Sequence, residues 1–246
     1  MFGHEKTNEV RLDVSHTFCR CDGLQYVCPF SNEDTSTLEM PLSGNVIILD
    51  AGHGGVDGGS VAKSGTLEKD VALDISLKLR DYLQASGALV YMTREDDSDL
   101  ANESTRGFSN RKTEDLKSRL EIINSSNADY YVSLHLNATP SSKWRGAQTF
   151  YNRTFEESKL MAESVQGEMV RQLENTNRSA LPIHNIFLVD RAEIPGVLVE
   201  VGFLSNIQEA ADLGTEEYQD KVAASIYQGM LRYKVPELAE ENEAGN

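Results

Sequence analysis

Cysteine is scarce in this chain of 246 residues, which contains only three: Cys19, Cys21 and Cys28. Three cysteines cannot all pair with one another. A Cys-x-Cys pair without a second pair farther along is also a poor zinc-binding spacing, even with His16 close by. Any catalytic metal site elsewhere in the chain would therefore have to use histidine and carboxylate ligands.

Basic residues are also few, with 23 Lys and Arg against 39 Asp and Glu and a formal net charge of −16. This acidic balance disfavours nucleic acids and anionic membranes as partners. Nucleotide binding is excluded as well, because counting GxGxxG from Gly52 puts Asp57 where the third glycine should be, and no GK[ST] follows. Capture of an anionic substrate would depend on groove shape and local hydrogen bonds.

Long hydrophobic runs are missing from Met1–Ser43, which has none of the length needed for a signal peptide or a membrane span. We expect residues 1–43 to be a poorly ordered N-terminal extension. One folded domain should follow over residues 44–235, with an acidic, disordered tail over residues 236–246. No internal repeat is visible.

Extended and helical patterns alternate along the expected domain. They predict strands near residues 45–50, 88–93, 130–135, 146–151, 185–189 and 197–202, and helices near 68–86, 113–126, 156–175 and 215–233. This alternation predicts an α/β fold with a mostly parallel, twisted sheet of about six strands and helices on both faces. Such sheets place their functional sites at one edge, beyond the carboxyl ends of the strands.

One carboxylate lies in an unusual position. Glu200 is in the middle of Val197–Leu204, a run that is otherwise apolar or glycine and is typical of a strand buried on both faces. An unpaired charge in an apolar interior is costly, so the group has to be paired, protonated or placed beside a cation. A functional role explains this glutamate better than packing does.

Two histidines and a second glutamate offer a site for that cation. His53 comes just after a β-branched run that glycines end, and His135 closes another extended run. Glu68 lies on the apolar stripe of a predicted helix, so its carboxylate should face the interior. Two imidazoles and one carboxylate form the ligand set of a catalytic metal site.

The ligand types favour zinc. Two neutral imidazoles and one carboxylate, without a nearby thiolate, suit a zinc ion whose fourth position stays open for water. Zinc lowers the pKa of that water from about 16 to roughly 7, which makes hydroxide available at neutral pH. The apolar neighbours of Glu200 should raise its proton affinity, which suits a general base and acid. The sequence therefore predicts hydrolysis of a peptide-type amide.

Each of these residues also has a simpler explanation. A histidine after a strand is more often a surface residue than a ligand, and Glu68 alone is an ordinary first-turn glutamate favoured by the helix dipole. All four together are hard to explain without a shared site. Asn137, two residues after His135, is a candidate donor to substrate. Arg94 and Arg119 are expected to pair with acidic residues and stabilise the fold.

Four segments around these residues resemble the zinc-dependent N-acetylmuramoyl-L-alanine amidases of bacterial cell walls. They are LDAGHGGVDGG (49–59), the glutamate of GTLEKD (65–70), SLHLNA (133–138) and VLVEVGFLSN (197–206). The resemblance covers about residues 41–234, and stretches such as KVAASIYQGMLRY are most similar to the sporulation branch, the germination-specific amidases of spore formers. It implies that His53, Glu68 and His135 hold one zinc ion and that Glu200 is catalytic.

The resemblance further implies a substrate and a setting. The substrate would be peptidoglycan, glycan strand with stem peptide, cleaved between N-acetylmuramic acid and L-alanine as the first step towards muramic δ-lactam in spore cortex. The expected location is extracytoplasmic, between the forespore and mother-cell membranes, although the export segment typical of this branch is not visible. An accessory sporulation protein is an expected partner. A zinc peptidase acting on stem peptides and a catalytically inactive peptidoglycan-binding module remain as alternatives.

Overall fold

The structure, a computed structural model, describes residues 40–235. The three cysteines, most of the expected N-terminal extension and the acidic tail lie outside these residues. None of the helices in the described part of the chain combines the length and apolar character needed to cross a membrane.

Six strands form one sheet in the order β2-β1-β3-β6-β4-β5. They are β1 (Val46–Ala51), β2 (Leu89–Met92), β3 (Tyr130–Asn137), β4 (Gln148–Tyr151), β5 (Leu181–Pro182) and β6 (Gly196–Phe203). β2, β1, β3 and β6 run parallel, whereas β4 pairs antiparallel with β6 and parallel with β5. The expected α/β fold with a mostly parallel sheet of about six strands is confirmed.

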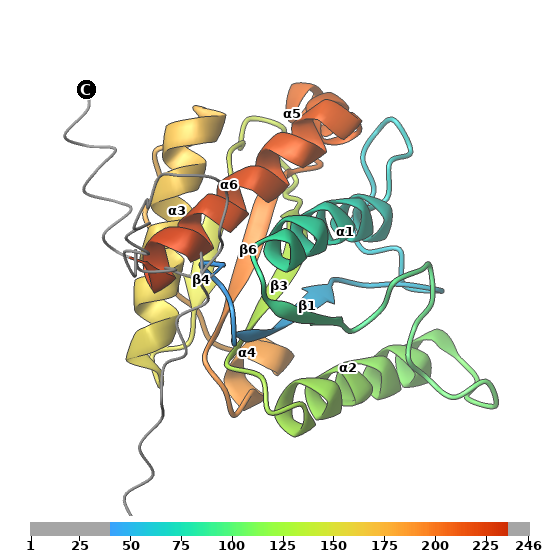
Figure 1. Cartoon of the computed structure of the whole chain (residues 1–246). Helices are drawn as coiled ribbons and strands as arrows, with labels where there is room; N and C mark the ends of the chain where they lie inside the picture. The colour runs from blue at the N-terminus through green and yellow to red at the C-terminus, as the bar shows by residue number, and fades with distance from the viewer. Residues whose placement is uncertain (1–39, 236–246) are drawn as a thin grey trace, which may run out of the picture. The chain divides into compact units, whose positions relative to one another are not determined.

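Helices cover both faces of the sheet, as expected (Figure 1). On one face lie α1 (Glu68–Ala85), α3 (Glu156–Leu173) and α6 (Glu216–Lys234), and on the other lie α2 (Phe108–Ser125) and α4 (Phe187–Arg191). The larger core includes Ile75 and Leu79 of α1 with Val199 of β6, and the smaller one includes Ile48 and Ile123. Fully burying an aliphatic side chain of this size contributes about 1.5–3 kcal/mol.

Four elements differ from the sequence prediction, and one of them is β5 (Leu181–Pro182), which no predicted strand covers. The strand expected at residues 185–189 is wrong: Phe187–Arg191 is the short helix α4, because Leu188 and Val189 are buried there and tertiary packing overrides β-propensity. α5 (Ile207–Leu213) was not predicted, although Asn206 caps it by accepting from the Glu209 N–H. α2 begins at Phe108 rather than near 113, since Phe108 is exposed and the residues that follow it in the first turn are polar, which gives no apolar period.

A buried ionic cluster holds the carboxyl end of β1. Fully buried Asp50 accepts hydrogen bonds from Arg119 Nη1 at 2.7 Å and Thr93 Oγ1 at 2.8 Å on one oxygen, and from Ser133 Oγ at 2.6 Å on the other. Arg119 also pairs with Asp115 one turn earlier on α2, at 2.9 Å. Burial by itself raises the pKa of Asp50, but Arg119 and the other partners outweigh it and bring the pKa to about 2. The cluster therefore links β1, β3 and α2 at one edge of the sheet.

This cluster predicts a loss of stability in acid. A carboxyl whose pKa is lower in the folded chain stabilises the fold above its unfolded pKa, and the contribution disappears as pH falls through the folded pKa. For Asp50 the window runs from about pH 4 to about pH 2, and the shift is worth about 2 kcal/mol. Asp50→Asn should therefore lower the free energy of unfolding near neutral pH. The gap between the unfolding free energies of variant and wild type should become smaller as the pH falls. Urea unfolding of both metal-free proteins across this range tests it, and a gap independent of pH would contradict it.

Candidate metal centre and active site

The topology brings the candidate site residues to one edge of the sheet. β1, β3 and β6 are parallel neighbours, so their carboxyl ends lie side by side. His53 follows β1 by two residues, His135 lies near the end of β3, and Glu200 of β6 is its partner in register. Glu68 is the first residue of α1. A pocket of about 390 Å³ is lined by all four.

Three of these side chains converge on one point. Glu68 Oε1 lies 3.2 Å from His53 Nε2 and 3.0 Å from His135 Nδ1. One ligand atom from each of the three lies within 4.8 Å of the other two. The two imidazole rings meet edge to face, with centroids 5.1 Å apart. The three residues could therefore hold a metal ion.

Backbone amides fix the carboxylate of Glu68. Its Oε1 accepts from the Leu136 N–H at 3.0 Å and its Oε2 from the Ser60 N–H at 2.8 Å. Burial by itself raises the pKa of Glu68, but hydrogen bonds with His135 and His53 outweigh it and hold the pKa far below its usual range. The group is thus an ionised acceptor with a fixed orientation, as a metal ligand needs to be.

Glu200 lies beside this cluster but takes a different environment. Its Oε2 is buried and has no hydrogen-bond partner among the described residues. Burial raises the pKa of Glu200 to about 7, although the imidazoles of His135 and His53 oppose the rise. The pKa values of the two glutamates in this pocket are thus shifted in opposite directions, down for Glu68 and up for Glu200. Such a pair suits a ligand on one side and a proton-transferring group on the other.

The donor set fits a catalytic metal better than a structural one. Two imidazoles and one carboxylate give three ligands, which leaves a further position open for substrate or water. Glu200, which carries the orphaned oxygen, lines the same pocket, so its carboxyl group is beside any group bound at that position. Zinc is the ion for which this ligand set is typical.

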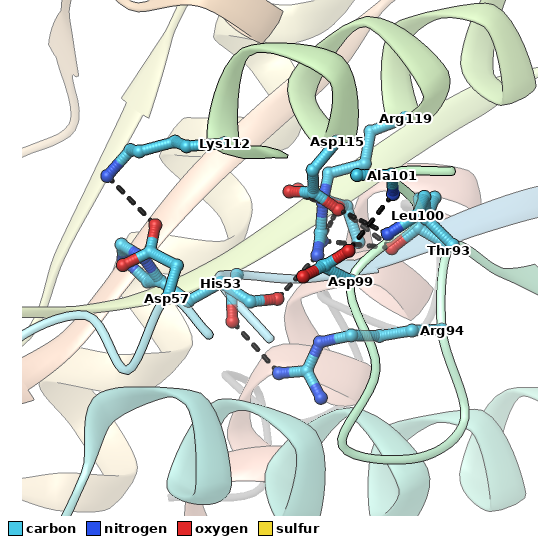
Figure 2. Close-up of polar contacts among 12 residues, drawn as sticks. His53, Asp57, Thr93, Arg94, Asp99, Leu100, Ala101, Lys112, Asp115 and Arg119 are labelled. Atoms are coloured by element: carbon cyan, nitrogen blue, oxygen red, sulfur yellow. Dashed lines mark hydrogen bonds and ion pairs between the residues drawn. The ribbon is translucent and has the colours of Figure 1, made fainter. Parts of the chain in front are cut away.

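Sequence reasoning missed a carboxylate that orients His53. Asp57 Oδ2 lies 2.9 Å from His53 Nδ1, and Lys112 Nζ of α2 lies 2.9 Å from the same oxygen (Figure 2). Burial by itself raises the pKa of Asp57, but Lys112 and His53 outweigh it and bring the pKa to about 2. A carboxylate on the far nitrogen of a ligating histidine fixes its tautomer and ring orientation. The signal was an aspartate four residues after the histidine, in a glycine-rich loop.

Asn137 is the last residue of β3 and lines the pocket, as does Lys112. Its expected role as a donor to substrate stays a prediction.

The two arginines that were expected to pair with acidic residues differ from each other. Arg119 does pair with Asp50 and Asp115, whereas Arg94 donates only to main-chain carbonyls in the described structure.

Comparison with known proteins agrees with this geometry. The model of the Amidase_3 family, described as N-acetylmuramoyl-L-alanine amidase, matches residues 47–232. The germination-specific N-acetylmuramoyl-L-alanine amidase of Bacillus subtilis (strain 168) is 55% identical over 205 residues, which cover 83% of this chain and 86% of that protein. The amidase LytC of the same strain is 32% identical, over 82% of this chain and 38% of LytC.

Solved structures show the same fold. The CwlD amidase from Clostridioides difficile, solved in complex with the GerS lipoprotein, has a TM-score of 0.75 and 46% sequence identity, covering 77% of this chain and 98% of that chain. An N-acetylmuramoyl-L-alanine amidase from Clostridium difficile 630 has a TM-score of 0.68 and 32% identity, covering 77% and 96%. These matches confirm the resemblance and the enzyme class that four short segments of sequence indicated. The chain belongs to the N-acetylmuramoyl-L-alanine amidase family.

Proposed function

We propose that this chain is a zinc-dependent amidase that hydrolyses the bond between N-acetylmuramic acid and L-alanine in peptidoglycan, during maturation of the spore cortex. The observation that carries the proposal is the convergence of His53, Glu68 and His135 in one pocket with the unpaired carboxylate of Glu200. In this proposal the first three residues hold one zinc ion and Glu200 is the catalytic residue. Residues 44–235 form the catalytic domain.

The chemistry divides between the ion and the chain. When bound, zinc supplies a Lewis acid for the amide carbonyl and lowers the pKa of a bound water to about 7. Glu200, with its own pKa raised to about 7, can both accept and release a proton near neutral pH. It takes a proton from the attacking water and gives it to the L-alanine nitrogen as the amide bond breaks. Asn137 at the pocket wall offers an amide to hydrogen-bond the substrate.

A digest of purified peptidoglycan tests the proposed reaction. Zinc-loaded protein should release L-alanine amino termini without new reducing sugar ends, and a chelator should abolish the release until zinc is added back. New amines from within the stem peptide would instead indicate a zinc peptidase. Binding of peptidoglycan without any new amine would indicate a catalytically inactive binding module.

The carboxylate behind His53 gives a second prediction. Asp57→Asn keeps the shape of the side chain but removes the charge that holds His53 Nδ1 at 2.9 Å. Loss of such a partner typically lowers metal affinity about 10–100-fold, and we expect a zinc dissociation constant raised by this factor. Competition with a fluorescent zinc chelator measures it. Lys112→Met, which removes only the outer partner of Asp57, should have a smaller effect, and equal zinc affinity in Asp57→Asn and wild type would rule out this role.

The setting is proposed from the relatives. The amidase from Bacillus subtilis is named as germination-specific, and CwlD was solved with a lipoprotein. For this chain we propose an extracytoplasmic location between the forespore and mother-cell membranes, and an accessory sporulation protein as partner. Spores of a strain that lacks the gene should contain cortex without muramic δ-lactam. Normal lactam content in such spores would argue against the sporulation role.

A further inference from the structure

His53 adopts a main-chain conformation that side chains rarely take. Its φ angle is 60°, in the left-handed region, where a residue with a Cβ is strained. Asn or Asp tolerates this region better, and glycine tolerates it best. Histidine is among the non-glycine residues that occur there more often than most, but the conformation still depends on contacts that hold the main chain in place. Two buried arginines bind the carbonyls of the segment Ala51–His53, and they approach this segment from opposite sides (Figure 2).

Arg119 binds the segment from the side of α2. Its Nη1 donates to the Ala51 carbonyl at 2.7 Å, and its Nη2 donates to the carbonyl of His53 itself. Arg119 is only 1% exposed, and Asp50 and Asp115 neutralise the charge of its guanidinium group and fix the plane of that group. Arg119 therefore fixes the main chain of His53 directly, and Asp57 fixes the side chain of the same residue.

Arg94 binds the segment from the side of α1. Its Nε donates to Ala51 O at 3.0 Å, and its Nη2 donates both to Gly52 O at 2.9 Å and to Lys69 O at 2.8 Å. Its Nη1 donates to Asp96 O at 2.9 Å. Lys69 follows Glu68 in α1, so a single nitrogen of Arg94 links the loop that carries His53 to the helix turn that carries Glu68.

The environment of Arg94 is unusual for a buried charge. The residue is 4% exposed, yet within residues 40–235 no carboxylate forms a salt bridge with it. Burying a cation without a directly bonded anion is costly. Four carbonyl oxygens accept all the hydrogen bonds of the Arg94 guanidinium, and Asp50, Asp97 and Asp115 favour its charge without bonding to it. A role in stability alone does not explain this arrangement, because an uncharged side chain would avoid the cost. Placement of the two site segments relative to each other does explain it.

We propose that Arg94 and Arg119 form an arginine clamp: they are positioning residues that hold the carbonyls of Ala51, Gly52 and His53 and thereby set His53 against Glu68. The clamp rests on the proposed zinc site. The guanidinium group of each arginine is planar and has five N–H donors, so it can bind several carbonyls in fixed directions. A lysine ammonium cannot reproduce this geometry. The clamp acts through His53 and touches no substrate.

Charge-conserving substitutions test the clamp. Arg94→Lys and Arg119→Lys should each raise the zinc dissociation constant about 10–100-fold, as loss of supporting contacts around a ligand typically does. Cobalt substituted for zinc should show an altered visible absorption spectrum in both variants, because the ligand geometry around the ion changes. A merely structural role would lower the melting temperature without changing zinc affinity or the cobalt spectrum in the folded protein.

Arg111→Lys is the matched control. Arg111 also lies on α2 and pairs with a carboxylate, Asp99, but it binds no carbonyl of the three clamped residues. This variant should bind zinc as wild type does. If Arg119→Lys fails to fold because it disturbs Asp50 and Asp115, Arg94→Lys carries the test, since it leaves no ion pair broken.

The outcomes separate the clamp from the proposed function. Wild-type affinity and an unchanged cobalt spectrum in folded Arg94→Lys would overturn the clamp while leaving the zinc site intact. Failure of the wild-type protein to bind zinc would overturn the proposed function itself. Weaker zinc binding in both clamp variants, with Arg111→Lys unaffected, is the expected result.

Discussion

Glu200→Gln should retain zinc but lose about 10²–10⁴-fold in kcat, the usual contribution of a positioned general acid and base. Glutamine has nearly the same shape as glutamate, so the pocket should keep its form, but the amide cannot accept and release a proton. The metal cluster is built by other side chains, and Oε2 of Glu200 has no partner to lose among the described residues. Zinc affinity and melting temperature should therefore stay close to those of wild type.

His135→Ala provides the contrast for this experiment. It removes one of the three converging ligand atoms, so zinc affinity and turnover should fall together. Steady-state kinetics on muropeptides, with zinc content measured on the same samples, distinguishes the two patterns. A zinc-loaded Glu200→Gln protein with wild-type kcat would remove Glu200 from the mechanism.

Gly52→Ala should lower kcat/KM about 100-fold, although the change adds a single methyl group outside the ligand set. A Cβ at Gly52 would lie 2.5 Å from Cε1 and 2.7 Å from Nδ1 and Nε2 of the His135 ring. These distances are far inside van der Waals contact, so the imidazole has to move. Displacement of a reacting group by about 1 Å can cost about 10²-fold in rate. Zinc affinity should fall with it, because the displaced nitrogen is one of the proposed ligand atoms.

Gly167→Ala is the matched control for that substitution. Gly167 lies inside α3, and a Cβ there would meet nothing within 4 Å. Alanine replaces glycine in a helix interior with a gain of about 0.5–1 kcal/mol in stability. The control should therefore unfold at a slightly higher temperature and keep full activity. Wild-type activity in Gly52→Ala would mean that the His135 ring is not confined as the structure places it.

The sequence predicts the sheet and the approximate positions of the site residues because both follow from local patterns. A polar residue at the end of an apolar run marks the carboxyl end of a strand, as with His135, and parallel strands bring such ends together. The sequence alone also identifies Glu200 as a candidate functional residue, because packing does not account for a carboxylate among valines. α5 was also within reach, since Asn206 and Glu209 have the spacing of an N-cap and its partner.

Other features depend on contacts that no local pattern contains. The apolar residues of Phe187–Arg191 suit a strand or a helix equally, and their burial in the smaller core decides between the two. Arg94 and Arg119 were expected to pair with acids, yet Arg94 binds carbonyls, which are present at every position of any chain. The support of His53 by Asp57 becomes evident only when the loop geometry is known.

X-ray absorption at the zinc edge, combined with metal analysis, tests the central claim that His53, Glu68 and His135 hold one zinc ion. The account predicts one zinc per chain, bound by imidazole nitrogen and carboxylate oxygen at about 2.0–2.2 Å. His135→Ala should remove the ion. A sulfur shell at about 2.3 Å, which would point to the cysteines instead, or zinc retained in full by His135→Ala, would contradict the account.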